Sequence, residues 1–305
     1  MATLTPADTT TVLAPRPPKM GRMAGFGRYL RRNPLLGIGL FIMIALLLFS
    51  TVGLLFIDRE NDPYPLAGPA SKAPSWQYPF GTDAQGRDML AVMIVGTQLS
   101  LRIGLMAGSI GLFIGIILGL VSAFYGGWID NVIRWVVDVM FTIPSFLVMV
   151  IIASMMKSFI TIESMALILA AFAWPAPTRL IRAQVLSLRE QQFVSMARLS
   201  GMKSPEIIVR ELLPNLMPML LSGFVGALIG AVYGALGLEL LGLGSQREPT
   251  LGMTFYWMQR FSALLRNLWW WWGIPIAIII LLILALFFIS FGMDEWANPR
   301  SRSTR

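Results

Sequence analysis

The stretch WWWWGIPIAIIILLILALFFISF, residues 269–291, decides the fold class, because it has no charged residue and is long enough to cross a bilayer as one helix. A similar run, LLGIGLFIMIALLLFSTVGLLF, covers residues 35–56. Of the 305 residues, 56% are apolar and 13% are charged, against about 25% charged residues in an average soluble domain. Such a chain cannot bury its apolar surface in a soluble globule. We therefore expect an all-α, polytopic membrane protein.

Six apolar stretches are predicted to be transmembrane helices, with approximate bounds 35–56, 103–125, 133–155, 160–175, 216–241 and 269–291. The fourth ends at Trp174-Pro175, and proline lacks the N–H that would continue the helical hydrogen bonding. We expect that helix to kink there or to continue past the membrane surface. The tryptophans at the start of the sixth stretch are typical of a membrane interface.

The distribution of Lys and Arg predicts the orientation, because these residues resist translocation across the membrane. With six crossings both termini share one side, and that side carries most of the basic residues. We predict a cytoplasmic basic tail (residues 1–34), a six-span permease domain (35–300) and a cytoplasmic end (301–305). Extracytoplasmic segments would cover 57–101 and 242–268, and a cytoplasmic loop 176–213. The net charge is +8, and we expect anionic lipid headgroups to be the partners of the basic residues. We therefore expect no nucleic-acid partner.

The chain contains neither Cys nor His, which excludes disulfides, Cys/His zinc sites and nucleophiles that need an imidazole base. It also lacks a G-x-x-x-x-G-K-[ST] phosphate loop. We therefore expect no catalytic residue, no metal and no cofactor in this chain.

The cytoplasmic loop carries start and stop signals for two short helices. Ser187 with Glu190 matches a capping box, so a helix should begin at Leu188. Gly201 suits the left-handed position just past its end. Ser204, followed by Pro205, is expected to cap a second helix.

On the first of these helices, helical spacing places four side chains on one narrow face: Phe193, Met196, Ala197 and Ser200. Arg198 lies on the neighbouring charged face. The apolar face could pack on the protein's own helices, as most such faces do. Alternatively, it could anchor in a groove on a partner.

At these residues the sequence resembles the permease family of ATP-binding-cassette importers. The family signature has E-A-A, three residues, Gly, nine residues, Ile, any residue and Leu-Pro. Here Ala197, Gly201 and Leu213-Pro214 match, whereas Ser195, Met196 and Glu211 depart from it.

A second block, PFGTDAQGRDML at residues 79–90, is similar to the segment before the second span in dipeptide and oligopeptide permeases of the C type. The matching residues are Gly81, Thr82, Asp83, Gly86, Arg87 and Asp88. The resemblance implies an outer lid or docking motif at this block. Ala235, Glu239 and Leu251 depart from the family pattern near the outer mouth.

The resemblance implies a type I importer architecture in a prokaryotic inner membrane. The expected partners are a second, different permease, two ATP-binding subunits that hold ATP and Mg²⁺, and an extracytoplasmic substrate-binding protein. The cytoplasmic helix would couple to the ATPase through Phe193, Ser195, Met196, Ala197, Arg198, Gly201 and Pro214. The solute would be a peptide, or else an oligosaccharide or a metal complex. Outside this family, a self-sufficient channel, a secondary transporter or a membrane-embedded enzyme are the rival functions.

Several charged residues allow both a structural and a functional interpretation. Arg134 and Asp138 are four residues apart, and we expect a structural salt bridge between them, with a role in gating as the alternative. Glu239 could face the pore and contact a solute ammonium, or lie at the wet membrane boundary. Asp83, Arg87 and Asp88 could be catalytic, as an acidic pair beside a base, or could form a turn network in which carboxylates accept backbone N–H bonds. We favour the turn network, as part of a structured outer lid or docking surface.

Overall fold

The computed structural model describes Leu30, residues 33–156 and residues 159–297, with side chains to residue 294. The predicted basic tail falls almost wholly outside these residues, as does the predicted end at 301–305. Within the described ranges the regular elements are helices, with an isolated bridge between Thr82 and Asp88.

Four helices in the described residues are long and apolar enough to cross a membrane, and the number is six if each of two bent helix pairs is one span. The four are α2 (Pro34–Val52), α3 (Met89–Tyr125), α10 (Leu213–Leu240) and α12 (Trp269–Ala297). The bent pairs are α4 (Gly127–Thr142) with α5 (Ser145–Met155), and α6 (Ile162–Ala173) with α7 (Pro175–Arg189). The predicted fold class, an all-α six-span membrane protein, is therefore confirmed.

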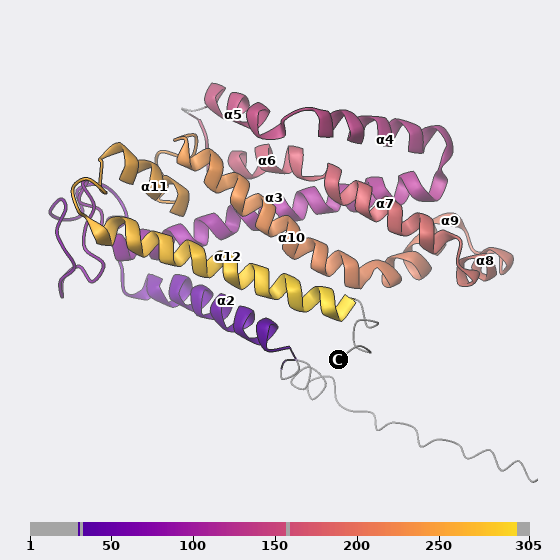
Figure 1. Cartoon of the computed structure of the whole chain (residues 1–305), viewed down its shortest axis with the longest axis horizontal. Helices are drawn as coiled ribbons and strands as arrows, with labels where there is room; N and C mark the ends of the chain where they lie inside the picture. Colours follow the sequence, from indigo (N-terminus) through magenta and orange to yellow (C-terminus); the bar gives the residue numbers. More distant parts are fainter. Residues whose placement is uncertain (1–29, 31–32, 157–158, 298–305) are drawn as a thin grey trace, which may run out of the picture.

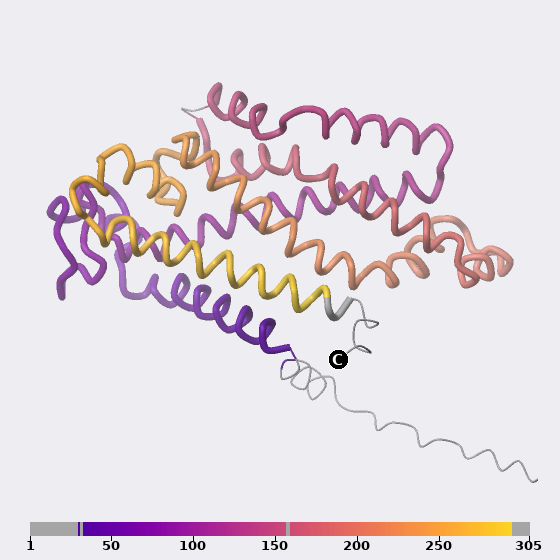
Figure 2. The backbone as a smooth tube through the Cα atoms, viewed as in Figure 1, coloured from indigo at the N-terminus to yellow at the C-terminus, as the bar shows by residue number. Residues whose placement is uncertain are grey.

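Both bends occur at proline. Pro144 precedes α5, and the axes of α4 and α5 differ by 78°. Pro175 begins α7, and the bend from α6 is 42°, which confirms the expected kink at Trp174-Pro175. Proline removes a helical N–H and crowds the preceding turn, so each helix changes direction at this residue. The breaks are visible in the backbone trace of Figure 2.

The long connections separate into two ends of the molecule (Figure 1). One end carries residues 57–88 and helix α11 (Leu251–Arg260); we call it the outer end. The other carries α8 (Gln192–Leu199), α9 (Ser204–Ile207) and a π-helical turn, η2 (Ile208–Leu212). The start of α2 and the end of α12 point toward that second end but stop well short of α8 and α9. Which side of a membrane each end faces stays a prediction.

Helix α3 begins earlier than its apolar stretch indicates. The stretch starts at Ile103, but the helix starts at Met89 because Asp88 accepts a hydrogen bond from the Leu90 N–H and caps it. A helix of 37 residues is about 55 Å long at 1.5 Å per residue, well beyond a bilayer core of about 30 Å. Its first twelve residues are largely buried, with α11 and α12 packed beside α3. The second span therefore continues into the outer end.

Glycines on α3 let its neighbours approach closely. A Cβ atom at Gly108 would lie 3.1 Å from the backbone of Ala227 in α10. At Gly115 it would lie 2.6 Å from Cβ of Pro177 in α7. Gly104 contacts α10, and Gly111 and Gly119 contact α6 and α7, in the same way. Small residues are enriched at helix contacts in membranes because they permit this backbone approach.

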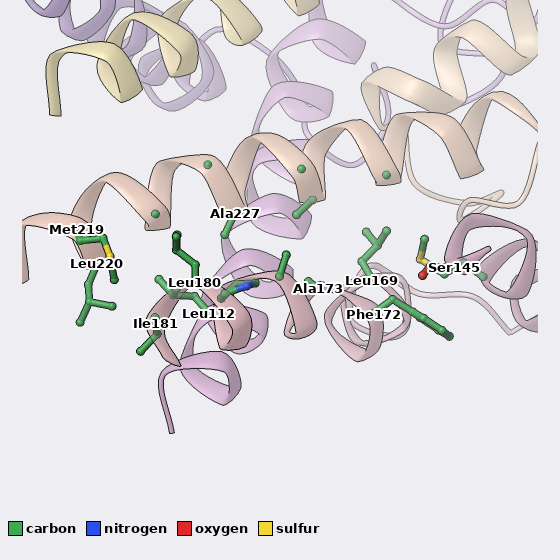
Figure 3. Close-up of a pocket in the computed structure, with 18 residues that line it drawn as sticks. Leu112, Ser145, Leu169, Phe172, Ala173, Leu180, Ile181, Met219, Leu220 and Ala227 are labelled. Atoms are coloured by element: carbon green, nitrogen blue, oxygen red, sulfur yellow. The ribbon is translucent and has the colours of Figure 1, made fainter. Parts of the chain in front are cut away.

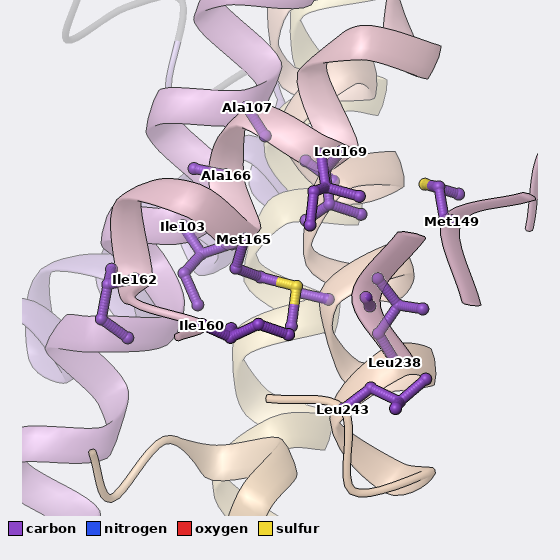
Figure 4. Packing of buried hydrophobic residues seen from close by; sticks show 14 of the residues in the cluster. Ile103, Ala107, Met149, Ile160, Ile162, Met165, Ala166, Leu169, Leu238 and Leu243 are labelled. Atoms are coloured by element: carbon purple, nitrogen blue, oxygen red, sulfur yellow. The ribbon is translucent and has the colours of Figure 1, made fainter. Parts of the chain in front are cut away.

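The buried apolar side chains form three clusters along the bundle. One joins α3, α5, α6 and α10 through residues such as Ile103, Met165 and Leu238, as Figure 4 shows. A second lies at the outer end around Trp271, among α2, α10, α11 and α12. A third, containing Ile181, Val194 and Leu216, joins α7, α8 and α10 at the opposite end. Helix α3 contributes to all three.

We predict that Gly115→Val lowers the midpoint of thermal unfolding in detergent, because the added methyl groups would overlap Pro177 of α7. Overpacking of this kind costs about 1–3 kcal/mol. The matched control is Gly226→Val in α10, where a Cβ atom meets nothing within 4 Å. Equal shifts for the two variants would show that the α3–α7 contact is not tight.

Candidate functional site

The segment predicted to be cytoplasmic has the expected helix-turn-helix form, with different helix boundaries. Helix α7 runs to Arg189, so Ser187 lies inside it and the predicted capping box with Glu190 is wrong. The buried face of α7, with Thr178, Ile181 and Val185, keeps packing beyond the local stop signal. Helix α8 starts at Gln192 without a side-chain cap.

The turn after α8 forms at the predicted glycine. Gly201 has φ of 80°, which confirms its left-handed conformation. The Met202 N–H donates to the Ala197 carbonyl at 3.1 Å and closes the turn. The second helix differs from expectation, because Lys203 is its N-cap residue and Ser204 is its first helical residue.

The structure divides the predicted apolar face of α8. Val194 and Ala197 are buried in the cluster with α9 and α10, whereas Met196 is 63% exposed and Leu199 84% exposed. Phe193 packs partly against the same cluster. The exposed apolar surface is therefore the α8 edge, which we define as Met196 and Leu199. Ser195, Arg198, Ser200 and Gly201 are exposed beside it, and Pro214 is exposed at the start of α10.

At the outer end, residues 81–88 form a buried polar network. The Asp83 carboxylate accepts bonds from the backbone N–H groups of Gln85 and Arg87, and from the Arg87 Nε at 2.5 Å. The Thr82 hydroxyl donates to the Pro69 carbonyl, and the Trp270 indole donates to the Thr82 carbonyl. The network thus ties the outer segment to α12.

The remaining members of this block support the same network. Gly81 and Gly86 have φ of 72° and 77°, a backbone conformation that favours glycine. Asp88 caps α3, and burial raises the pKa of its carboxyl. All six motif residues are buried, so a partner would meet the surrounding surface and not these side chains. A docking role for the block stays a prediction.

Glu239 is neither at a wet boundary nor on a groove. It is 1% exposed near the end of α10, where the Thr250 side chain and the Gly252 N–H are its polar neighbours, and neither carboxyl oxygen makes a well-formed hydrogen bond among the described residues. Gly252 at the start of α11 packs against it, since a Cβ atom there would lie 2.2 Å from its Oε2. In this arrangement the predicted contact with a solute ammonium is not available.

The predicted pair of Arg134 with Asp138 is wrong. The Arg134 Nη2 donates to the Asn131 side chain at 2.7 Å. Asp138 instead accepts from Arg179 of α7 at 2.6 Å. Asp130 accepts two bonds from Arg182, at 2.5 and 2.6 Å. Spacing within α4 could not show this, because the partners come from a helix more than forty residues later.

A groove of about 500 Å³ lies between α3, α5, α6, α7 and α10 (Figure 3). Gly223, Gly226 and Gly230 of α10 face it, and a Cβ atom at each would meet nothing within 4 Å. Among the described residues that line the groove, Ser145 has a polar side chain and the others are apolar residues or glycine. The groove is therefore apolar, with exposed backbone along α10. No group of three or more acidic side chains in the described residues could hold a metal ion.

We predict that Asp83→Leu strongly destabilises the outer end, because it leaves the Arg87 guanidinium buried without its carboxylate partner. Breaking a buried pair on one side costs about 3–5 kcal/mol. The double variant Asp83→Leu/Arg87→Leu should recover the part of this loss that comes from the unpaired guanidinium, but not the two backbone N–H bonds to Asp83. The measurements are thermal unfolding and protease cleavage within residues 57–88. If the double variant is no more stable than the single one, the pair does not organise this segment.

We also predict that Glu239→Met raises the unfolding midpoint, since at nearly constant volume it removes a buried carboxyl that makes no well-formed hydrogen bond to its neighbours Thr250 and Gly252. The expected gain is about 1–3 kcal/mol. The control is Glu163→Gln, whose side chain is 48% exposed in an ion pair with Arg102. A clear loss of stability in Glu239→Met would mean that the carboxyl has a stabilising partner.

Comparison with known proteins agrees with this architecture. The family model "Binding-protein-dependent transport system inner membrane component" matches residues 111–303. The solved structure of the MetNI methionine ABC transporter, in an inward-facing conformation, contains a chain similar to this one, with a TM-score of 0.55 and 19% identity. The alignment covers 71% of this chain and 98% of that chain, and it shows the fold alone.

Curated relatives carry permease names. The oligopeptide transport system permease protein OppC of Mycobacterium tuberculosis is 34% identical over 173 residues, which span 57% of this chain and 60% of that protein. The dipeptide transport system permease protein DppC of Alkalihalophilus pseudofirmus is 31% identical over 72% of this chain and 71% of its own length. A putative peptide permease protein of Brucella abortus is 30% identical over 93% of both chains. The chain therefore belongs to the family of inner-membrane permease components of binding-protein-dependent ABC transport systems.

Proposed function

We propose that this chain is one of two different permease subunits of an ATP-driven importer and forms half of the path for peptides or similar small solutes. Family membership supports the transport role, and the names of the relatives, which specify oligopeptides and dipeptides, support the solute class. An oligosaccharide or a metal complex is the alternative solute. The chain itself would carry out no catalytic step, and partner ATPase subunits would hold ATP and Mg²⁺.

The α8 edge is the observation that carries the coupling role. Met196 and Leu199 are exposed, whereas Val194 and Ala197 on the opposite face of α8 are buried in the apolar cluster. An apolar edge on a short helix beyond the end of the bundle fits helix-in-groove recognition by another protein. Val194 and Ala197 are buried in the cluster that joins this end of the bundle, and α8 packs on α7 and α9, so a push on the edge would reach the bundle.

Two continuous connections would carry that push into the membrane. Helix α7 leads directly into the segment before α8 and packs along α3. On the other side, η2 joins α9 to α10, and π-helical turns of this kind are frequent at functional sites. Both α7 and α10 line the groove. A displacement of α8 would therefore alter the groove from two sides.

The groove is the candidate half of the solute path in this proposal. A second permease would face it and complete the walls. Its lack of charged lining residues suits solutes of varied side-chain charge, and selectivity would then depend on the substrate-binding protein at the outer end. The α8 end would face the cytoplasm of the cell, as the positions of Lys and Arg predict.

We predict that Met196→Cys crosslinks to an ATPase subunit in the assembled transporter. The chain has no native cysteine, so a single introduced thiol reports one position. Leu265→Cys, at an exposed apolar residue of the outer end, is the matched control and should not reach the ATPase. A crosslink from both positions, or from neither, would refute the proposed contact between α8 and the ATPase subunit.

The same position tests the function in vesicles that contain all the subunits. Met196→Asp should lower ATP-dependent peptide uptake about tenfold or more, the size expected for loss of a central interface anchor. Competition by unlabelled peptides, oligosaccharides and metal complexes would identify the solute class. Uptake that is unaffected by Met196→Asp and Leu199→Asp together would contradict the coupling role.

A further inference from the structure

Two ion pairs attach α4 to α7, and we call them the α4–α7 clasp. Asp130 receives two bonds from Arg182, and Asp138 receives one from Arg179 at 2.6 Å. The arginines are one turn apart on α7, and the aspartates are two turns apart on α4. Because the helices run in opposite directions, both pairs form at once (Figure 1).

The two pairs differ in their surroundings. The side chains of Asp130 and Arg182 are 14% and 23% exposed, and the Ser122 hydroxyl also donates to Asp130. Those of Asp138 and Arg179 are 58% and 56% exposed. The Arg179 guanidinium additionally lies 4.2 Å from the centre of the Phe141 ring. The first pair is therefore the firmer attachment, and the second can open at lower cost.

Apolar packing holds α4 weakly. Val137 is its buried residue, while Trp128, Val132 and Trp135 are exposed. Helix α4 packs on α3 and α7, and its polar bonds to α7 are those of the clasp. Its position relative to α7 thus depends on the two ion pairs more than on burial.

The clasp joins the coupling segment to a wall of the groove. On one side, α7 continues toward α8. On the other, α4 passes through the 78° bend at Pro144 into α5, whose Ser145 and Met149 line the groove. A rigid α4–α7 attachment would therefore move α5 whenever α7 moves.

We infer that the α4–α7 clasp transmits the displacement of α8 to α5 and so sets the width of the groove. Arg179 and Arg182 are positioning residues in this scheme, since they touch no solute and act through α4. The inference rests on the proposed function, because it assumes that an ATPase displaces α8. It assigns to α7 a second role besides connecting α6 to α8, because its arginines would transmit the movement of α7 to α4 and α5.

The test compares solute uptake with ATP hydrolysis in vesicles that contain the complete transporter. Arg182→Asp should leave ATP hydrolysis in place and lower the solute taken up per ATP about tenfold, within the usual range for coupling between sites. The exchange variant Asp130→Arg/Arg182→Asp should restore the ratio. Arg179→Asp should have a smaller effect, because its pair is more exposed.

The control is the ion pair of Arg102 and Glu163, which lies outside the clasp and matches the Arg179–Asp138 pair in its 2.6 Å separation and in exposure. Arg102→Glu should leave the uptake per ATP unchanged. Thermal unfolding of each variant identifies any that fails to fold, and the exchange variant keeps the test decisive if Arg182→Asp does. An unchanged ratio in folded Arg182→Asp, or an exchange variant that does not recover, overturns the inference.

A second measurement observes the movement itself. Spin labels on cysteines introduced at Leu147 in α5 and Leu240 in α10 should change separation on addition of ATP, and Arg182→Asp should abolish this change. The Met196→Cys crosslink to the ATPase, repeated in Arg182→Asp, separates the two proposals. If Arg182→Asp keeps both the crosslink and the distance change, the inference about the clasp is wrong and the proposed function still holds. If Met196→Cys without the Arg182 substitution gives no crosslink to the ATPase, both proposals are wrong.

Discussion

The close approach of helices to the glycine face of α3 is the constraint on which the rest of the structure depends. Lipid supplies little hydrophobic drive for helix association, so helices in a membrane must gain their contacts by packing closely. Helix α10 approaches α3 closely at Gly104 and Gly108. Helices α6 and α7 do so at Gly111, Gly115 and Gly119. Since α3 also contributes to all three buried clusters, it acts as the axis around which the other spans are placed.

This axis separates the outer end, with its buried polar network, from the α8 end, which has an exposed apolar edge. At the outer end, Asp83 and Arg87 form a buried pair, and Trp270 bonds to the same turn, so segments from distant parts of the chain are tied together. At the other end, α8 has one face packed and one edge free. Between them lies a groove with walls from helices that connect to α8. Such an arrangement suits a subunit that receives force at one end and changes a path in the middle.

Hydropathy and proline predicted the six spans and the kink at Pro175, because these properties act within one segment. The left-handed turn at Gly201 followed for the same reason. The sequence did not predict that Ser187 would lie within α7, since the contacts of Ile181 and Val185 with other helices override the capping signal. The partners of Asp138 and Asp130 come from α7, and no spacing rule within α4 indicates them. Similarly, the burial of Glu239 depends on Gly252 of α11. Local patterns thus predicted the elements, and the contacts between elements decided the site.

The central claim is that transport by this chain depends on an ATPase acting through the cytoplasmic helix. The most direct measurement compares solute flux in vesicles that contain this chain alone with flux in vesicles that contain the second permease, the ATPase subunits and the binding protein as well. Our account predicts no flux from the single chain and uptake in the full assembly that stops when ATP is withheld. Solute flux through the single chain without ATP would contradict it and would favour a channel or a secondary transporter.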